Sequence, residues 1–391
     1  MSKVKKLATM LLVFATFISI FGAGGIAVSE KIKLVILPGK VGTGWNMDEV
    51  DYLLAILEEQ ALELGRFQIF PRGDLQQIMK ERNLTEFGIS EAIEIGKIGG
   101  SKYALLLTLT ELTSSWSSKL NMYEAVTRYT IKLYNVENGE LLASKTMTSA
   151  GSSKDTSQKA ITAALNSTAS SIWLELRNIF KIEAYVKNVE DGEVLLAGID
   201  PRIAKKGYIF KIETDTEPAY VKVIGYDKIE NAIVAKFMYG GTPKIYDVAI
   251  EYPTLPISGG VGFSIFSGKF GIGVTGWTEA NEETPIAFHF ALGTFLGNIL
   301  GFSPAYVNFG LDFNLIQIGR MGAHINGGLS IIGLIDMETF EPVNYIYGIF
   351  AGGLLTYEMN PSFGFYGSLG YSLYIDNYGP TGLTLQLGVY F

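Results

Sequence analysis

Side chains able to do acid–base or metal chemistry are scarce in this 391-residue sequence. There is no cysteine, and His289 and His324 are the only histidines. A thiol nucleophile, a disulfide and a thiolate metal site are therefore excluded, and a site built from several histidines is not supported. We expect no bound metal.

Polar residues of the C-terminal third recur at every second position, between apolar ones. Successive side chains of a β-strand point to opposite faces, so the polar set should share one face, which is the interior if the sheet closes into a barrel. It could form a polar pore or a small binding site. We favour a hydrogen-bonded plug, because an eight-stranded barrel is filled by its own side chains. The predicted interior residues are His289, Asn308, Asp312, Asn314, His324, Asn326 and Gln386.

Other candidates for catalysis are weak. The segment 39–44 (GKVGTG) superficially resembles a phosphate-binding loop but lacks the Gly-Lys-Ser/Thr ending before a helix. Asp215 and Glu217 fall in a predicted hairpin turn, where solvated acids are ordinary. Neither a Gly-x-Ser-x-Gly elbow nor a His-Glu-x-x-His helix occurs. The sequence therefore predicts no catalytic residue, no cofactor and no enzyme.

Charge divides the chain into two dissimilar parts. Charged residues make up 18% of the whole, below the roughly 25% of an average soluble protein. The segment 256–391 holds only Lys269 and Arg320 as basic residues, but it is rich in glycine and aromatic residues. With a net charge of −8 and no basic block, the chain has little support as a nucleic-acid binder.

The segment 256–391 has the alternation of a transmembrane β-barrel. A bilayer-facing strand needs apolar residues at every second position, and closure is required because lipid offers strand edges no hydrogen-bonding partner. A soluble β-sandwich is the alternative, but it would need charged outer faces. An even strand count places both ends of the barrel on one side. The eight expected strands span 257–266, 268–277, 285–295, 307–315, 323–331, 344–358, 363–375 and 383–391.

Both ends of the chain resemble sorting signals of exported proteins. Residues 1–29 resemble a secretory signal peptide, with three lysines, an apolar run over 7–21, and small residues suited to cleavage after Ala27 or Ser29. An uncleaved membrane anchor is the alternative. At the other end, Leu385, Leu387, Val389 and Phe391 resemble the insertion signal of bacterial outer-membrane proteins.

Between these signals, residues 30–180 alternate between strand and helix periodicity. A three-stranded antiparallel meander is expected in the middle, and one long amphipathic helix closes the unit. Asp74 and Ser90 are the expected caps of two short helices. The predicted strands are 31–38, 67–70, 103–112, 123–136 and 140–147, and the predicted helices are 47–64, one after Asp74, 90–98 and 157–180.

Several strings of this unit resemble a known family. Phe70-Pro71-Arg72, the segments 78–83 (IMKERN) and 92–100 (AIEIGKIGG), and the strand 103–109 are similar to the CsgG-type periplasmic α/β domain. Related domains occur in LpoB-like activators, the middle of FlgT and the N-terminal part of TolB. The resemblance implies a non-enzymatic module that binds or assembles proteins in the bacterial envelope.

The segment 181–255 is expected to be a small all-β domain of six short strands. The phrase 198–210 (GIDPRIAKKGYIF) resembles a pattern of small β-barrel domains that follow CsgG-like domains in FlgT-type proteins. Such a unit could be a spacer, a docking surface or a rigid connector.

These observations predict a multidomain protein with an α/β domain, a small all-β domain and an eight-stranded antiparallel transmembrane β-barrel. We expect it in the outer membrane, with its N-terminal domains in the periplasm. Its expected partners are outer-membrane lipid and periplasmic or envelope proteins. Whether the chain also forms homo-oligomers is left open. The expected function is non-enzymatic: the CsgG-like periplasmic domain binds or assembles envelope proteins, and the C-terminal barrel anchors it. The alternatives are a curli-type secretion or transport channel, and an adhesin using the outer loops 297–303, 335–343 and 376–380.

Overall fold

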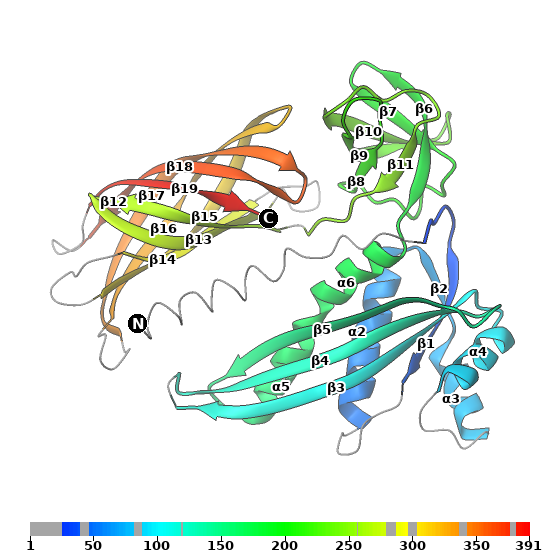
Figure 1. Cartoon of the computed structure of the whole chain (residues 1–391). Helices are drawn as coiled ribbons and strands as arrows, with labels where there is room; N and C mark the ends of the chain where they lie inside the picture. Colours follow the sequence, from blue (N-terminus) through cyan, green and yellow to red (C-terminus); the bar gives the residue numbers. More distant parts are fainter. Residues whose placement is uncertain are drawn as a thin grey trace.

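The computed structural model describes residues 26–39, 47–81, 88–118, 120–255, 257–278, 287–295, 303–335, 342–375 and 381–391. Residues 1–25 of the predicted signal peptide lie outside this range, as do most of the segment 39–44 and most of the three candidate outer loops. The described chain forms a mixed five-stranded sheet with helices, a closed six-stranded barrel and a closed eight-stranded antiparallel barrel (Figure 1). The predicted fold class is confirmed. Among the described helices, none is long and apolar enough to cross a membrane.

The five-stranded sheet has the order β2-β1-β3-β4-β5. Strand β1 lies between β2 and β3 and pairs in parallel with both, and the meander β3 to β5 is antiparallel, as predicted. The strands are β1 (Ile32–Pro38), β2 (Phe67–Ile69), β3 (Tyr103–Ser117), β4 (Met122–Asn135) and β5 (Leu141–Ser153). The helices are α2 (Met47–Leu64), α3 (Arg72–Glu81), α4 (Ile89–Ile98), α5 (Ser157–Asn166) and α6 (Thr168–Ile179).

Strand β1 is buried because helices cover both faces of the sheet. Leu34 and Ile36 belong to the cluster that includes α2 and α6, whereas Val35 and Leu37 belong to the cluster that includes Ile95 of α4. A strand covered on both sides reads as a continuous apolar run, which is the pattern of this segment.

The two predicted helix caps are wrong. Helix α3 begins at Arg72, so Asp74 lies within its first turn, where an acid favours the helix dipole. Gly88 is the N-cap of α4, and Ser90 is already helical. Polar residues favour both the cap and the first turn, so sequence does not separate the two positions.

The predicted single helix over 157–180 is two helices that meet at Ser167. The Ser167 hydroxyl donates to the carbonyls of Ala150, 3.0 Å away, and Ala164, 2.8 Å away. The bond to Ala150 connects the junction of the two helices to β5. The next residue of β5, Gly151, has no Cβ, so the backbone of α5 can pack closely against it. Amphipathic periodicity continues across the break, which is why the sequence suggested one helix.

The six-stranded barrel closes in the order β10-β7-β6-β11-β8-β9. Asp191 and Gly192 both have positive φ, as the tight turn between β6 and β7 requires. The strands are β6 (Glu183–Glu190), β7 (Glu193–Ala197), β8 (Ile209–Ile212), β9 (Ala219–Asp227), β10 (Ala232–Tyr239) and β11 (Val248–Glu251).

All eight predicted C-terminal strands are present, and β12 pairs with β19 to close the barrel. A single sheet closed on itself replaces the alternative of a two-sheet sandwich. Strands β15, β16 and β17 are longer than predicted. The strands are β12 (Ile257–Phe266), β13 (Lys269–Thr278), β14 (Ala287–Phe295), β15 (Ser303–Ile318), β16 (Met321–Ile335), β17 (Pro342–Asn360), β18 (Phe363–Tyr374) and β19 (Gly382–Tyr390).

Candidate functional site

The outer face of the eight-stranded barrel is apolar. Strand β17 shows this over its full length, because every second residue points outward and none of these residues is charged. Leu329 on β16 and Phe309 on β15, which lie opposite each other, are 61% and 56% exposed. The outward row of β17 is Val343, Tyr345, Tyr347, Ile349, Ala351, Gly353, Leu355, Tyr357 and Met359.

Tyrosines lie near both ends of this apolar row. Tyr347 and Tyr357 lie ten positions apart on β17, and the outward residues between them are Ile349, Ala351, Gly353 and Leu355. At about 3.3 Å per residue and a tilt of about 40°, ten residues span about 25 Å along the barrel axis. That matches the height of the apolar band of membrane barrels, which aromatic residues flank.

The four residues of the expected insertion signal lie along β19 and just beyond it. Leu385 and Leu387 are exposed on the outer face, and Val389 is half-buried. Phe391 follows the strand, and its backbone exchanges two hydrogen bonds with Gly259 at the start of β12, at 2.8 and 2.9 Å. The segment therefore seals the barrel where the first and last strands meet.

The interior holds most of the predicted polar set. His289, Asp312 and Gln386 are buried, and Asn308, His324 and Asn326 are half-buried. Asn314 is exposed instead. It pairs with His324 in the register, as the alternation predicts, and lies near the end of β15, before the register shift that follows it.

The interior side chains form separate small hydrogen-bonded groups. His324 Nδ1 lies 2.7 Å from an Asp312 carboxylate oxygen, and the Ser330 hydroxyl donates to Asn308 Oδ1 at 2.7 Å. Gln386 donates to the Tyr306 hydroxyl at 2.8 Å. His289 is not joined to these groups through its Nδ1, which has no hydrogen-bond partner.

Sequence reasoning missed the aromatic residues that fill the two ends of the interior. Trp277, Leu354, Tyr366 and Tyr390 form one buried cluster. The other cluster contains Phe266, Ala291, Phe295, Tyr306, Ile332, Leu334 and Ile346. The sequence did contain a signal for these clusters. Glycine occupies inward positions where a Cβ would collide with the aromatic ring of a residue on a neighbouring strand.

One example of this fit is Tyr306. A Cβ at Gly293 would lie 2.5 Å from its ring, and a Cβ at Gly273 would collide with its hydroxyl. Glycine on two adjacent strands therefore makes space for one inward tyrosine.

The cavity described among the polar residues of the barrel interior is small. A cavity of about 30 Å³ lies among Asn308, Asn326, Gln386 and His289. Since one water needs roughly 10–15 Å³ on this measure, the cavity suits about two water molecules. The polar side chains that line the cavity can bind water or hydrogen-bond to one another. The cavity is too small to contain a drug-sized ligand or a peptide.

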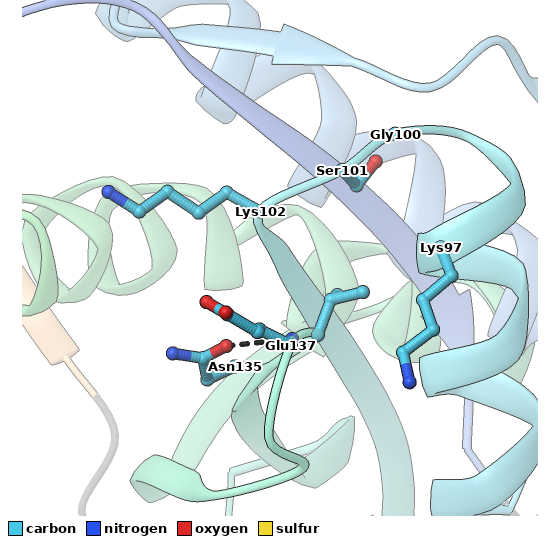
Figure 2. Close-up of a pocket in the computed structure, with 7 residues that line it drawn as sticks. Lys97, Gly100, Ser101, Lys102, Asn135 and Glu137 are labelled. Carbon is cyan, nitrogen blue, oxygen red and sulfur yellow. Dashed lines mark hydrogen bonds between the residues drawn. The ribbon is translucent and has the colours of Figure 1, made fainter.

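A larger hollow, of about 340 Å³, lies on the α/β unit beside the C-terminal end of α4. Figure 2 shows Lys97 and Lys102 extending in different directions, with Asn135 and Glu137 between them. Asn135 Oδ1 accepts a hydrogen bond from the Glu137 amide at 2.8 Å. The two ammonium groups do not converge, so the hollow has no built anion site. Within the described ranges, no three His, Asp or Glu side chains come together as metal ligands.

No protein-family model and no curated protein matches this chain. Several solved structures are similar to parts of it. Lipoprotein GNA1162 from Neisseria meningitidis is 16% identical, with 36% of this chain and 97% of that chain covered and a TM-score of 0.29. A PelC dodecamer from Paraburkholderia phytofirmans is 19% identical, with coverages of 38% and 91% and a TM-score of 0.27. The N-terminal β-barrel domain of Pseudomonas aeruginosa OprF is 11% identical, with coverages of 34% and 95% and a TM-score of 0.28.

Proposed function

We propose that this chain is an outer-membrane protein whose C-terminal barrel anchors a periplasmic α/β domain that binds other envelope proteins. The domain limits proposed are 1–29 for the signal peptide, 30–180 for the α/β domain, 181–255 for the small barrel and 256–391 for the membrane barrel. The barrel takes the place of a lipid anchor, since the chain lacks the cysteine that a lipoprotein modification requires.

One observation carries the membrane part of this proposal: the uncharged outer row of β17, with Tyr347 and Tyr357 near its two ends. In water this surface would leave large apolar side chains such as Leu329 and Phe309 exposed around a closed barrel. In hydrocarbon the same surface is favourable, and the closed sheet leaves no backbone group unpaired at an edge.

The filled interior supports an anchor over a pore. Two aromatic and aliphatic clusters occupy the interior, and the cavity between the polar side chains is only about 30 Å³. A conducting channel would need a continuous aqueous path, which eight strands rarely enclose.

The β3–β4 hairpin supports the protein-binding part. Near its tip Trp116 is 47% exposed, and its ring packs edge-on against Tyr123 with centroids 4.8 Å apart. Leu120 is 50% exposed in the same turn. Exposed aromatic and aliphatic groups on a projecting hairpin suit contact with another protein, because aromatic anchors dominate protein interfaces.

Flotation of the full chain with liposomes tests the anchor. We expect protein refolded with lipid vesicles to float with them and to resist extraction with alkaline carbonate. Release of the whole chain into the aqueous fraction as a monodisperse species would contradict membrane insertion.

Site-specific photo-crosslinking in cells tests partner binding. A photoreactive residue at Trp116 should capture an envelope protein, whereas one at Lys228, exposed on the six-stranded barrel, serves as the matched control. Identical products from both positions would contradict a partner site at the hairpin.

A further inference from the structure

Two adjacent residues at the end of β11 contact two different parts of the molecule. Glu251 is the last residue of β11 and binds side chains of the α/β unit. The next residue, Tyr252, contacts the eight-stranded barrel. Neighbouring side chains of an extended chain point to opposite sides, so one short segment can hold both neighbours of the six-stranded barrel.

The first junction is a buried ion cluster. Arg66 binds the Glu251 carboxylate through two nitrogens, at 2.7 and 3.1 Å, and Arg177 of α6 binds it through Nε at 2.6 Å. The exposed fractions are 0% for Arg66 and 2% for each of the other two residues. The α/β unit therefore supplies both cations, and the six-stranded barrel supplies the anion.

Backbone groups and aromatic rings complete this junction. Arg66 also donates to the carbonyl of Phe180 at 2.6 Å, and the Ile182 amide donates to Glu251 at 3.1 Å. The Arg177 guanidinium lies 4.4 Å from the ring centre of Trp173 and 4.1 Å from that of Tyr208. A shift of one unit against the other that broke these contacts while the cluster stayed buried would leave a charge without its partner, which is costly.

The second junction joins the six-stranded barrel to the rim of the eight-stranded one. Arg320, in the turn between β15 and β16, pairs with Glu217 at 2.9 Å, and its guanidinium lies 4.7 Å from the ring centre of Tyr239. It also donates to the carbonyl of Met359 at 2.6 Å. One arginine thus bridges two rim turns and the neighbouring domain.

Tyr252 adds a contact at the same rim. Its hydroxyl lies 3.3 Å from Asn360 Oδ1, at the end of β17. Its ring packs edge-on against Tyr220 with centroids 5.6 Å apart, and Tyr220 packs on Tyr239 at 5.3 Å. The aromatic cluster therefore connects the Tyr252 contact with the Arg320 contact. Figure 1 shows the chain passing from β11 to β12 between the two barrels.

We propose that the end of β11 couples the three units into one rigid body, so that the α/β unit is carried at a fixed orientation to the eight-stranded barrel. Glu251 fixes one side and Tyr252 with Arg320 fixes the other. The α/β unit would then also have a fixed orientation relative to a membrane, and this part rests on the proposed function. The coupling itself does not depend on lipid.

Spin-label distance measurements on the full chain in detergent test the coupling. The chain has no native cysteine, so each introduced pair is unique. Cysteines at the exposed positions Ser152 and Lys228 report on the first junction, and cysteines at Lys228 and Ile375 report on the second. We expect narrow distance distributions for both pairs in the otherwise unchanged chain.

The variants should act on one junction each. Glu251→Gln should broaden the first distribution at least twofold and leave the second unchanged, whereas Arg320→Gln should do the reverse. Glu230→Gln, which removes a solvent-exposed ion pair with Lys187 on the same small barrel, is the matched control and should change neither. If Glu251→Gln does not fold, Arg177→Lys keeps the charge, loses the fork geometry and should broaden the first distribution.

Broad distributions in the unchanged chain, or an unchanged width in folded Glu251→Gln and Arg320→Gln, would overturn the coupling. Either result leaves flotation unaffected, and a failure of flotation leaves these distances unaffected. The two proposals therefore fail separately.

Discussion

Glu251 accepts hydrogen bonds from two arginines while almost fully buried. Burial by itself raises the pKa of this carboxyl, but the charges and hydrogen bonds of Arg66 and Arg177 outweigh it and hold the pKa below its ordinary value. A carboxyl with a lowered folded pKa stabilises the fold above its unfolded pKa, and that stability is lost as the pH falls through the folded value.

The stability difference between the unchanged chain and Glu251→Gln should therefore be constant from pH 8 to pH 5. Below about pH 4.3, the unfolded pKa of glutamate, the difference should shrink. At neutral pH the variant should lose about 3–5 kcal/mol, because two arginines stay buried with no anion. Urea unfolding followed by tryptophan fluorescence measures this, since Trp173 lies against Arg177. A difference that shrinks between pH 8 and pH 5 would contradict it.

Asn314, which lies two residues after Asp312 on β15, provides a control for a substitution of Asp312. Asp312→Leu removes the partner of His324 Nδ1 in the barrel interior and should cost about 1–3 kcal/mol. Asn314→Leu, two residues along and exposed, should change stability by less than about 0.5 kcal/mol. The temperature at which the folded barrel loses its characteristic gel mobility compares the two. Equal effects would contradict a plug role for the interior pair.

Val28 bears on the site of signal-peptide cleavage. It is 2% exposed, pairs with Ile182 and accepts a hydrogen bond from the Glu183 amide at 3.0 Å. Cleavage after Ala27 would keep this residue, and cleavage after Ser29 would remove it. We therefore expect N-terminal sequencing of the exported protein to begin at Val28, which places the end of the signal peptide at Ala27, two residues before the limit of the proposed segment 1–29. A first residue of Glu30 would contradict this expectation.

At the scale of the element, strand β16 tests whether hydrocarbon surrounds the barrel. Leu329 lies midway along β16 and faces outward, and Met321 faces outward at its rim. Leu329→Lys should destabilise the barrel in lipid by about 2–4 kcal/mol, against about 0–1 kcal/mol for Met321→Lys, because the cost of a charge depends on its depth in the bilayer.

Reversible unfolding in lipid vesicles measures both variants. Equal, small effects of the two lysines would indicate that water surrounds both positions. Comparable exposure of the two original side chains, 61% and 59%, makes the pair well matched.

At the scale of the whole molecule, the filled barrel interior predicts that the protein does not conduct ions. The cavity near His289 has room for only about two waters, and aromatic clusters occupy the interior on either side of the polar residues. Purified protein in planar bilayers should show no stable conductance. A large steady conductance would favour the secretion or transport channel over the anchor.

The sequence by itself determined the strands of the C-terminal barrel and which residues face outward. Leu385 and Leu387 could be assigned to the outer face because strand geometry repeats every two residues and lipid demands apolar groups at one of them. The same local rule located most of the interior polar residues. It did not indicate that Asn314, which pairs with His324 near the end of β15, is exposed.

Tertiary structure alone decided the features that join distant segments. Arg66 and Glu251 lie 185 residues apart, and neither stands in a motif, so no local pattern announces their contact. The break at Ser167 depends likewise on the Ala150 carbonyl of another element. Periodicity reports what surrounds each strand or helix, whereas a junction between domains depends on which surfaces meet when the whole chain has folded.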